Sequence, residues 1–443
     1  MKIYIDTLGC PKNQNDSEMA AGILEKAGHE MVAEPYEADV IMVNTCGFIN
    51  DAKKESIDRI FELAEVKGEA LLVVSGCLSQ RYGAELYKEM PEVDLFIGVN
   101  EYTELPRLLS ALAEKKAVSA DARDKYFCGP CDAFDNCTER KIAENPYTAT
   151  LKIAEGCDNV CTYCIIPKIR GGYRSRKMED VLSEAEMLAR KGCKELVLIA
   201  QDISAYGMDI YGKYSLAELL RRLCKIDGIE WIRLMYCYDD RITDELIEVM
   251  ASEPKICHYI DIPIQHSSDR ILTAMNRRSS REGIVNTIKK LRAAMPDIHI
   301  RTTLITGFPG ETREDFDDLC EFVAETAFER LGVFAYSKEE GTLAAEMKNQ
   351  VRSDVKERRR DKIMRMQLEI SLAKNEEKVG KVLEVMVDGV DEDGAYIGRS
   401  RYDAPEIDNS VIFTSDRELK PGDIVKVEIT DAFDYDLAGY ERS

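Results

Sequence analysis

Three cysteines in the middle of the chain, Cys157, Cys161 and Cys164, form a C-x3-C-x2-C run. The run directly follows a predicted strand over residues 150–155. Three thiolates can bind three irons of an iron–sulfur cubane, and the fourth iron then stays open to an exogenous chelator. A structural zinc site is the alternative, but zinc needs a fourth ligand, and no His or Cys lies within the next 25 residues. The spacing therefore favours an iron–sulfur site.

Cys10, Cys46 and Cys77 lie too far apart in the sequence to form a local metal motif. Each of them follows a predicted strand, over residues 2–6, 39–44 and 71–75 respectively. The carboxyl ends of parallel strands meet at one edge of a sheet, where ligands bind in open α/β folds. We therefore expect a second three-thiolate site, whose vacant iron could hold a sulfur species. Unrelated buried thiols are the alternative.

Cys128 and Cys131 form a third group, Cys-Gly-Pro-Cys, with Cys137 nearby. The spacing is that of a redox dithiol, but no strand and following helix are predicted around it, so a thioredoxin-like site is disfavoured. An accessory zinc site, a sulfur relay and inert linker thiols remain open. The other five cysteines stand alone in apolar or helical stretches and are expected to be small core residues: Cys193, Cys224, Cys237, Cys257 and Cys320.

The composition limits the class of protein. A length of 443 residues indicates about three domains. The net charge of −22 argues against nucleic-acid binding by the chain as a whole. No apolar run approaches the ~18 residues that span a membrane, and the first residues read as a strand and not as a signal peptide. We expect a soluble, cytoplasmic protein with no membrane partner.

The elements around these cysteines predict an α/β protein. Residues 1–121 alternate strands with helices at 17–27, 53–67 and 82–90, which indicates a doubly wound parallel sheet with a fourth strand at 94–98. Residues 122–146 read as a charged, cysteine-containing linker.

Residues 147–375 carry a second and longer strand–helix series, which ends in a helix over 354–374. Six strands are too few for a closed eight-stranded barrel, so we predict an open, partial (β/α) barrel. These strands are expected at residues 150–155, 195–201, 231–236, 259–265, 299–307 and 331–336. The last segment, 376–443, has short alternating runs typical of a small β-barrel.

The C-x3-C-x2-C run at the end of the first barrel strand resembles the radical S-adenosylmethionine (SAM) superfamily. That resemblance implies that SAM chelates the open iron, that one electron cleaves it, and that the resulting 5′-deoxyadenosyl radical abstracts a hydrogen from an unactivated carbon. Residues 8–13 (LGCPKN), 44–46 (NTC) and 75–78 (SGCL) resemble the amino-terminal domain of the methylthiotransferase family, and the last segment resembles its TRAM barrel. The family resemblance implies two [4Fe-4S] clusters, of which the first carries or passes on sulfur.

The methylthiotransferase family divides between tRNA-modifying enzymes and enzymes that modify an aspartate of the twelfth small-subunit ribosomal protein. Residues 8–13, 152–157, 166–171, 262–266 and 402–408 resemble the ribosomal, RimO-type branch. This branch implies methylthiolation at the aspartate β-carbon, with an electron donor and a sulfur source as further partners. Residues 378–443 hold eight basic and sixteen acidic residues, which suits a basic protein better than tRNA. A tRNA enzyme and a non-catalytic iron–sulfur or ribosome-binding protein are the alternatives.

A few further residues are candidates. Gln201 ends the second barrel strand, where radical SAM enzymes often contact the cofactor's amino group. Gly307 lies in a segment, 302–311, that resembles the family's cofactor-side turn, although a tight turn alone would explain it. His266 is either a site residue or a strand-end His that a backbone carbonyl satisfies. We expect three acidic residues of the last domain to attract the substrate: Asp403, Glu406 and Asp408. The sequence assigns no catalytic side chain.

Overall fold

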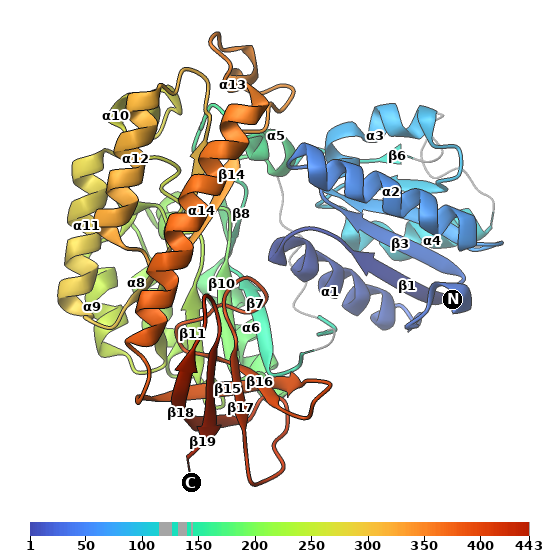
Figure 1. The fold of residues 1–443 in the computed structure, drawn as a ribbon. Helices are drawn as coiled ribbons and strands as arrows, with labels where there is room; N and C mark the ends of the chain where they lie inside the picture. The colour runs from blue at the N-terminus through green and yellow to red at the C-terminus, as the bar shows by residue number, and fades with distance from the viewer. Residues whose placement is uncertain (115–125, 132–139, 143–144, 443) are drawn as a thin grey trace.

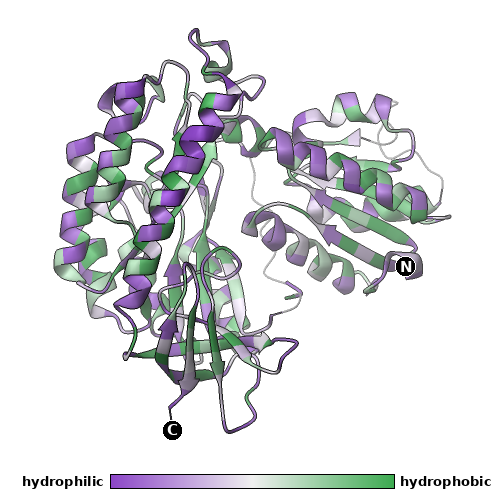
Figure 2. Cartoon of the chain, viewed as in Figure 1, coloured by the Kyte–Doolittle hydropathy of each residue, from purple (hydrophilic) through white to green (hydrophobic). Residues whose placement is uncertain are grey.

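The computed structural model describes residues 1–114, 126–131, 140–142 and 145–442. Cys137 lies outside the described residues. Figure 1 shows a first α/β unit, from blue to cyan, beside a larger α/β unit, and a small barrel at the base of the larger unit. In Figure 2 the strands are mostly apolar, and the helices carry polar residues on their outer faces. The described helices include none that is long and apolar enough to cross a membrane.

The first unit is a six-stranded parallel sheet in the order β2-β1-β3-β4-β5-β6. Apolar side chains of helices α1 and α4 pack on one face of the sheet, and those of α2 and α3 pack on the other. The predicted doubly wound sheet is therefore confirmed. Its strands are β1 (Lys2–Thr7), β2 (Glu30–Met31), β3 (Val40–Thr45), β4 (Leu71–Gly76), β5 (Leu95–Ile97) and β6 (Tyr126–Phe127), and its helices are α1 (Pro11–Lys26), α2 (Asn50–Val66), α3 (Cys77–Glu89) and α4 (Leu105–Ala113).

The three predicted helices of this unit begin earlier than the sequence predicted, α2 by only three residues, at residue 50 and not 53. Helix α1 starts at Pro11, a residue well suited to a first helical position, and not at residue 17. Helix α3 starts at Cys77 and not at residue 82. The first turns of α1 hold buried polar residues, so the apolar periodicity that marks a helix begins only later. As a result Cys10 and Cys77 lie at helix amino termini. The sheet also gains the unpredicted edge strand β6, within the segment that read as a linker.

The second unit is an open six-stranded parallel sheet in the order β14-β13-β12-β11-β10-β7, which confirms the partial barrel. Its strands are β7 (Thr148–Lys152), β10 (Glu195–Ile199), β11 (Trp231–Leu234), β12 (Ile256–Asp261), β13 (His299–Thr306) and β14 (Arg330–Ala335). The longer helices are α6 (Met178–Arg190), α8 (Leu216–Leu223), α9 (Asp244–Ser252), α11 (Arg281–Ala294), α12 (Arg313–Thr326) and α14 (Ser353–Glu376). Shorter elements are β8 (Ala154–Glu155), β9 (Arg174–Ser175), α5 (Ile166–Arg170), α7 (Met208–Tyr211), α10 (Asp269–Ala274) and α13 (Leu343–Glu346).

The last unit is a closed five-stranded barrel, which confirms the predicted small β-barrel. Its strands are β15 (Val382–Val390), β16 (Tyr396–Ser400), β17 (Val411–Thr414), β18 (Ile424–Ala432) and β19 (Leu437–Glu441). Met386 and Ala404 of this unit share one buried apolar cluster with Trp231, Cys257 and Tyr259 of the partial barrel. The small barrel therefore covers apolar side chains of the larger one.

Two of the three acidic residues expected to attract the substrate instead lie at this contact between the small barrel and the partial barrel, which we call the seam. Asp403 accepts a hydrogen bond from Arg330 (3.1 Å), and the Asp408 carboxylate accepts one from the Tyr259 hydroxyl (2.6 Å). Both acidic side chains are only 2% exposed, whereas Glu406 is exposed. The expectation of a surface role for Asp403 and Asp408 was wrong, because Arg330 and the Tyr259 hydroxyl, both on strands of the partial barrel, hold these carboxylates inward.

Candidate functional site

The first cysteine group gathers at the carboxyl edge of the first sheet, after β1, β3 and β4. Cys46 lies close enough to Cys10 and Cys77 for their charges to interact, and so do Cys10 and Cys77 with each other. Two glycines allow this approach. A Cβ at Gly9 would lie 2.9 Å from the Cys46 Cβ, and one at Gly47 would lie 2.7 Å from the Cys77 carbonyl oxygen. The structure thus brings together three cysteines from three separate loops.

Burial dominates the chemistry of these thiols when no metal is bound. It raises the pKa of Cys46 to about 12, and it also raises the pKa of Cys77. Both pKa values are raised further by the neighbouring thiols. Cys46 and Cys77 are therefore unfavourable as bare thiolates, but binding to iron deprotonates cysteine ligands and removes the conflict. This donor set fits an iron–sulfur cluster.

The second cysteine group forms a compact loop between β8 and α5. Gly156 has a φ of +76°, and a Cβ there would collide with the Gly172 carbonyl, so the turn before Cys157 requires glycine. Cys164 accepts a hydrogen bond from the Ile166 amide (3.4 Å). Burial raises the pKa of Cys157 to about 11 and that of Cys164 to about 12. The nearby Cys161 thiol raises both pKa values further, and Cys157 also raises the pKa of Cys164. This group also fits a cluster.

Neither cysteine group is arranged as a site for a single metal ion. Among the residues that the structure describes, no three His, Cys, Asp or Glu side chains are placed to hold one metal ion. The three cysteine ligands of a cubane bind three different irons and need not converge on one point. The arrangement of both groups is therefore less suited to the structural zinc alternative.

A buried ionic junction connects the two cysteine groups. Arg170, at the end of α5, donates to the Cys77 sulfur (3.3 Å), to Asp16 of α1 (2.7 Å) and to Glu155 of β8 (3.3 Å). Lys152 of β7 also donates to Asp16 (2.6 Å) and to Glu155 (3.0 Å). All five side chains are buried. Two cations thus balance two carboxylates, while Arg170 reaches the thiol of the first site.

The junction extends to Gln201, the predicted cofactor contact. The Gln201 amide nitrogen donates to Glu155 (2.6 Å), and this carboxylate precedes the second cysteine loop. The Gln201 carbonyl oxygen is buried and accepts no hydrogen bond within the described residues. A fixed, unsatisfied amide oxygen suits an ammonium group. The geometry of Gln201 therefore fits the amino group of SAM.

Gly307 has a different environment. Its amide donates to the Glu311 carboxylate (2.7 Å), and a Cβ there would collide with the Lys356 side chain. The positive φ of +71° and close packing against α14 thus already require glycine at this position. His266 is buried, and its Nδ1 accepts hydrogen bonds from the amides of residues 267 and 268, both 3.0 Å long. The expected backbone carbonyl partner is replaced by these two donors.

The Cys-Gly-Pro-Cys segment lies at the edge of the first site. Cys128 directly follows β6, and its sulfur lies 3.6 Å from the Ser79 hydroxyl. Cys131 donates to the Ile169 carbonyl (3.1 Å). Burial, with a contribution from the nearby Glu101 carboxylate, raises the pKa of Cys128 to about 12 and that of Cys131 to about 11. Both are thiols at neutral pH, unlike the low-pKa thiol of a thioredoxin-like site.

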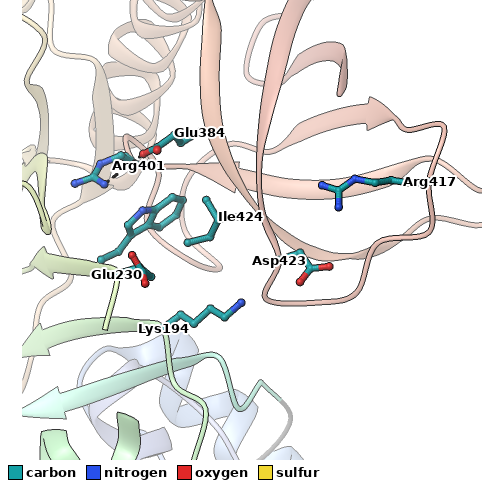
Figure 3. A pocket seen from close by; sticks show the side chains of 8 residues that line it. Lys194, Glu230, Glu384, Arg401, Arg417, Asp423 and Ile424 are labelled. Carbon is teal, nitrogen blue, oxygen red and sulfur yellow. Dashed lines mark hydrogen bonds and ion pairs between the residues drawn. The ribbon is translucent and has the colours of Figure 1, made fainter. Parts of the chain in front are cut away.

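A pocket at the seam between the two barrels is unrelated to the cysteine sites. Figure 3 shows Lys194, Glu230, Arg401 and Arg417 among its lining residues. The pocket lies at the amino-terminal ends of β10 and β11, opposite to the end that carries the cysteines. Lys194 and Arg401 donate to backbone carbonyls, and Arg417 pairs with Glu441. The lining cations are therefore used within the chain.

Sequence reasoning missed the ionic junction. No role was assigned from the sequence to four of its residues: Asp16, Lys152, Glu155 and Arg170. One signal was present: Lys152 and Glu155 are charged residues within a segment that reads as a buried strand. Such residues are rarely fully buried unless they are paired. The identity of their partners could not be read from the sequence.

Three family models match successive parts of the chain. The Uncharacterized protein family UPF0004 matches residues 2–98, the Radical SAM superfamily matches residues 151–323, and the TRAM domain matches residues 379–440. Among solved structures, the radical SAM methyltransferase TsrM from Kitasatospora setae has a TM-score of 0.56 at 13% identity, covering 75% of this chain and 72% of that one. The cobalamin-dependent SAM radical enzyme OxsB has a TM-score of 0.53 at 14% identity, covering 83% of this chain and 56% of that one. At these identities the likeness concerns the fold.

Curated relatives extend over the whole chain. The ribosomal protein uS12 methylthiotransferase RimO of Acetivibrio thermocellus is 51% identical over 442 residues, which are 99% of this chain and 98% of the relative. The protein of the same name from Pelotomaculum thermopropionicum is 51% identical over 444 residues, covering 99% of each. That of Clostridioides difficile is 48% identical, covering 99% of this chain and 98% of the relative. With three matching domain models and such identity over its full length, the chain belongs to the RimO family of radical SAM methylthiotransferases.

Proposed function

We propose that this protein attaches a methylthio group to the β-carbon of an aspartate in ribosomal protein uS12. The structural observation that carries the proposal is the meeting of two three-cysteine groups, from two different units, at one buried ionic junction. The reaction needs a C–H bond to be activated next to a source of sulfur, and adjacent sites suit that need. The name of the relatives supplies the substrate.

We assign Cys10, Cys46 and Cys77 to a first [4Fe-4S] cluster. The second cluster is assigned to Cys157, Cys161 and Cys164. When bound, the second cluster and SAM supply a carbon radical that removes a hydrogen from an unactivated carbon, and SAM also supplies the methyl group. The chain itself binds and orients these groups.

Gln201 is proposed to accept a hydrogen bond from the SAM ammonium group, because its amide oxygen is buried without a partner among the described residues. Glu155 holds this amide in place from the other side (2.6 Å). Arg170 is proposed as a positioning residue that stabilises the Cys77 thiolate and ties the first unit to the second. Gly307 is proposed to form the turn beside SAM, where the absence of a side chain leaves room for Lys356.

The chain is proposed to divide into a methylthiotransferase amino-terminal domain (1–121), a linker (122–146), a radical SAM domain (147–375) and a TRAM domain (376–443). The small barrel packs against strands of the radical SAM domain. Trp231 and Tyr259 are buried between the two domains, where water is excluded. The linker includes β6, which pairs with the first sheet.

Substrate attraction is proposed to come from acidic residues of the TRAM domain that are exposed. This set differs from the one expected from sequence and shares with it only Glu406. The exposed acidic side chains of residues 376–443 are Glu376, Glu377, Glu384, Glu392, Asp393, Glu406, Asp416, Glu418, Asp431 and Asp434. They would attract a basic ribosomal protein and repel tRNA, mainly through long-range charge, so the binding should weaken as salt is raised. An electron donor and a sulfur source are further partners, and we place the reaction in the cytoplasm with the ribosome.

The proposal is tested by anaerobic incubation of the reconstituted enzyme with SAM, a reductant and either uS12 or tRNA, with products identified by mass. We expect a methylthio group on uS12 and none on tRNA. Product on tRNA alone would favour the tRNA-modifying alternative, and no SAM cleavage with either substrate would favour a non-catalytic protein. Replacing the three cysteines of the second group by Ala should abolish SAM cleavage, whereas replacing those of the first should retain cleavage but abolish sulfur attachment.

The iron content gives a second, independent measurement. Two cubanes hold about eight irons per chain, and loss of either cysteine group should leave about four. About four irons in the intact protein would contradict the assignment of the first group. For the TRAM surface, Asp431→Lys with Asp434→Lys should weaken uS12 binding and leave SAM cleavage unchanged; unchanged affinity would contradict the proposed surface.

A further inference from the structure

The first sheet carries a fourth cysteine at its ligand-binding edge. Cys10, Cys46 and Cys77 follow β1, β3 and β4, and Cys128 directly follows β6 in the same parallel sheet. In Figure 1 strand β6 lies beside α3, the helix that Cys77 begins. The Cys-Gly-Pro-Cys segment is thus delivered to the cysteine site by a strand of the sheet.

Specific contacts hold this segment in place. The Gly129 amide donates to the Glu101 carboxylate (2.7 Å), and the Gln80 side chain donates to the Gly129 carbonyl (3.0 Å). The Cys128 thiol donates to the Ser79 carbonyl (3.6 Å). Ser79 and Gln80 belong to the first turn of α3, directly after Cys77. The same turn therefore positions both a proposed cluster ligand and the segment.

The second thiol of the pair faces the first site. Cys131 packs with Cys77, Val99 and Ile169 in one apolar cluster, and its sulfur donates to the Ile169 carbonyl (3.1 Å). The next residue, Arg170, donates to the Cys77 sulfur (3.3 Å). Cys77 itself is buried, whereas Cys128 and Cys131 are half-buried. The pair is therefore more exposed than Cys77, the buried cysteine of the first site.

We propose that Cys128 and Cys131 form a sulfur-accepting thiol pair, which takes a sulfane sulfur from a persulfide and releases it as sulfide beside the first cysteine site. Each thiol reacts in its deprotonated form, and solvent takes its proton. This inference rests on the proposed function, in which the first site needs sulfur. The donor class is a protein or small-molecule persulfide.

The chemistry balances in two steps. First, the Cys131 thiol loses its proton to solvent and attacks the outer sulfur of the donor R–S–SH, and the departing R–S⁻ takes a proton from solvent to leave as R–SH. Second, Cys128 attacks the inner sulfur of the Cys131 persulfide, so that a Cys128–Cys131 disulfide forms and hydrogen sulfide leaves. The sulfane sulfur gains two electrons, which the two thiols lose. A dithiol reductant then restores the pair.

The test treats the full-length, reconstituted protein with cysteine persulfide, without SAM or uS12, and maps the alkylated cysteines by mass. In the intact protein we expect a Cys128–Cys131 disulfide and about one sulfide released per chain, the stoichiometry of one dithiol. Cys128→Ser should trap one additional sulfur atom on Cys131. Cys131→Ser should give neither product. Cys224→Ala, which removes a buried lone thiol of the radical SAM domain, is the matched control and should behave like the intact protein.

Iron content and the yield of folded protein are measured for each variant, and Cys128→Ala and Cys131→Ala repeat the comparison where a serine variant folds poorly. Equal sulfide release from all variants, or no persulfide on Cys131 in Cys128→Ser, would overturn the inference and leave inert thiols. Because no SAM chemistry is involved, failure here is distinct from failure of the methylthiotransferase proposal, which the uS12 assay decides.

Discussion

Replacing Arg170 tests whether the buried ionic junction between the two cysteine groups stabilises the protein more than an exposed charge does. Replacing it by Gln removes four polar contacts at once, to Asp16, Glu155, Asn13 and the Cys77 sulfur. Lys152 would then be the remaining cation of this junction for two buried carboxylates. Breaking a buried ion pair by removing one partner costs ~3–5 kcal/mol, so we expect a loss of that size in the free energy of unfolding.

The pH dependence of this loss has a definite sign. The pKa of Glu155 is held well below its ordinary value by Lys152 and Arg170, against the opposing effect of burial. A depressed carboxyl pKa contributes stability that is fully present above the unfolded value of ~4.3 and is lost as the pH falls towards the folded value. Arg170→Gln weakens this contribution. The difference in stability between variant and intact protein should therefore be greatest near neutral pH and shrink below about pH 4.

Stability is measured by urea unfolding of the apoprotein, monitored by circular dichroism. Iron content is measured separately, after reconstitution. Arg170→Gln should lower the iron from about eight to about four per chain, since the Cys77 thiolate loses its cation. Arg170→Lys should recover part of the stability, because it keeps the charge but not the fork that reaches several groups. Arg190→Gln, on the exposed face of α6, is the control and should change stability by less than ~0.5 kcal/mol. If Arg170→Gln behaves like that control, the junction has no such role.

Three further changes test other parts of the structure. Asp403→Asn leaves Arg330 buried without its carboxylate and should lower stability in thermal unfolding by ~3–5 kcal/mol. The exposed Glu406→Gln should have no measurable effect, and equal effects of the two changes would contradict a stabilising role of the Arg330–Asp403 pair between the barrels. Gln201→Leu should weaken SAM binding by about tenfold or more in equilibrium dialysis, because a hydrogen bond to a charged group is worth ~1.5–3 kcal/mol, and unchanged affinity would remove Gln201 from the site. Gly156→Ala should lower iron incorporation at the second site, since the new Cβ collides with a backbone carbonyl; full iron content would show that the turn tolerates it.

The sequence by itself determined the local parts of this protein. The C-x3-C-x2-C spacing defines three thiols on one short loop, and the structure holds that loop as a compact turn. Apolar runs of strand length separated by helical periodicity predicted both parallel sheets, because the burial of a strand or a helix face follows from its own residues. From strand order alone, Cys10, Cys46 and Cys77 could be expected at one edge.

Only the tertiary structure decided which charged residues are solvated. Asp16 and Arg170 are 154 positions apart and meet fully buried, whereas Asp403 turns from the small barrel to Arg330. A carboxylate has the same sequence signature on a surface and in a buried ion pair. The difference lies in a partner from a distant segment, because a charge can leave water only where the assembled fold supplies an opposite charge within reach.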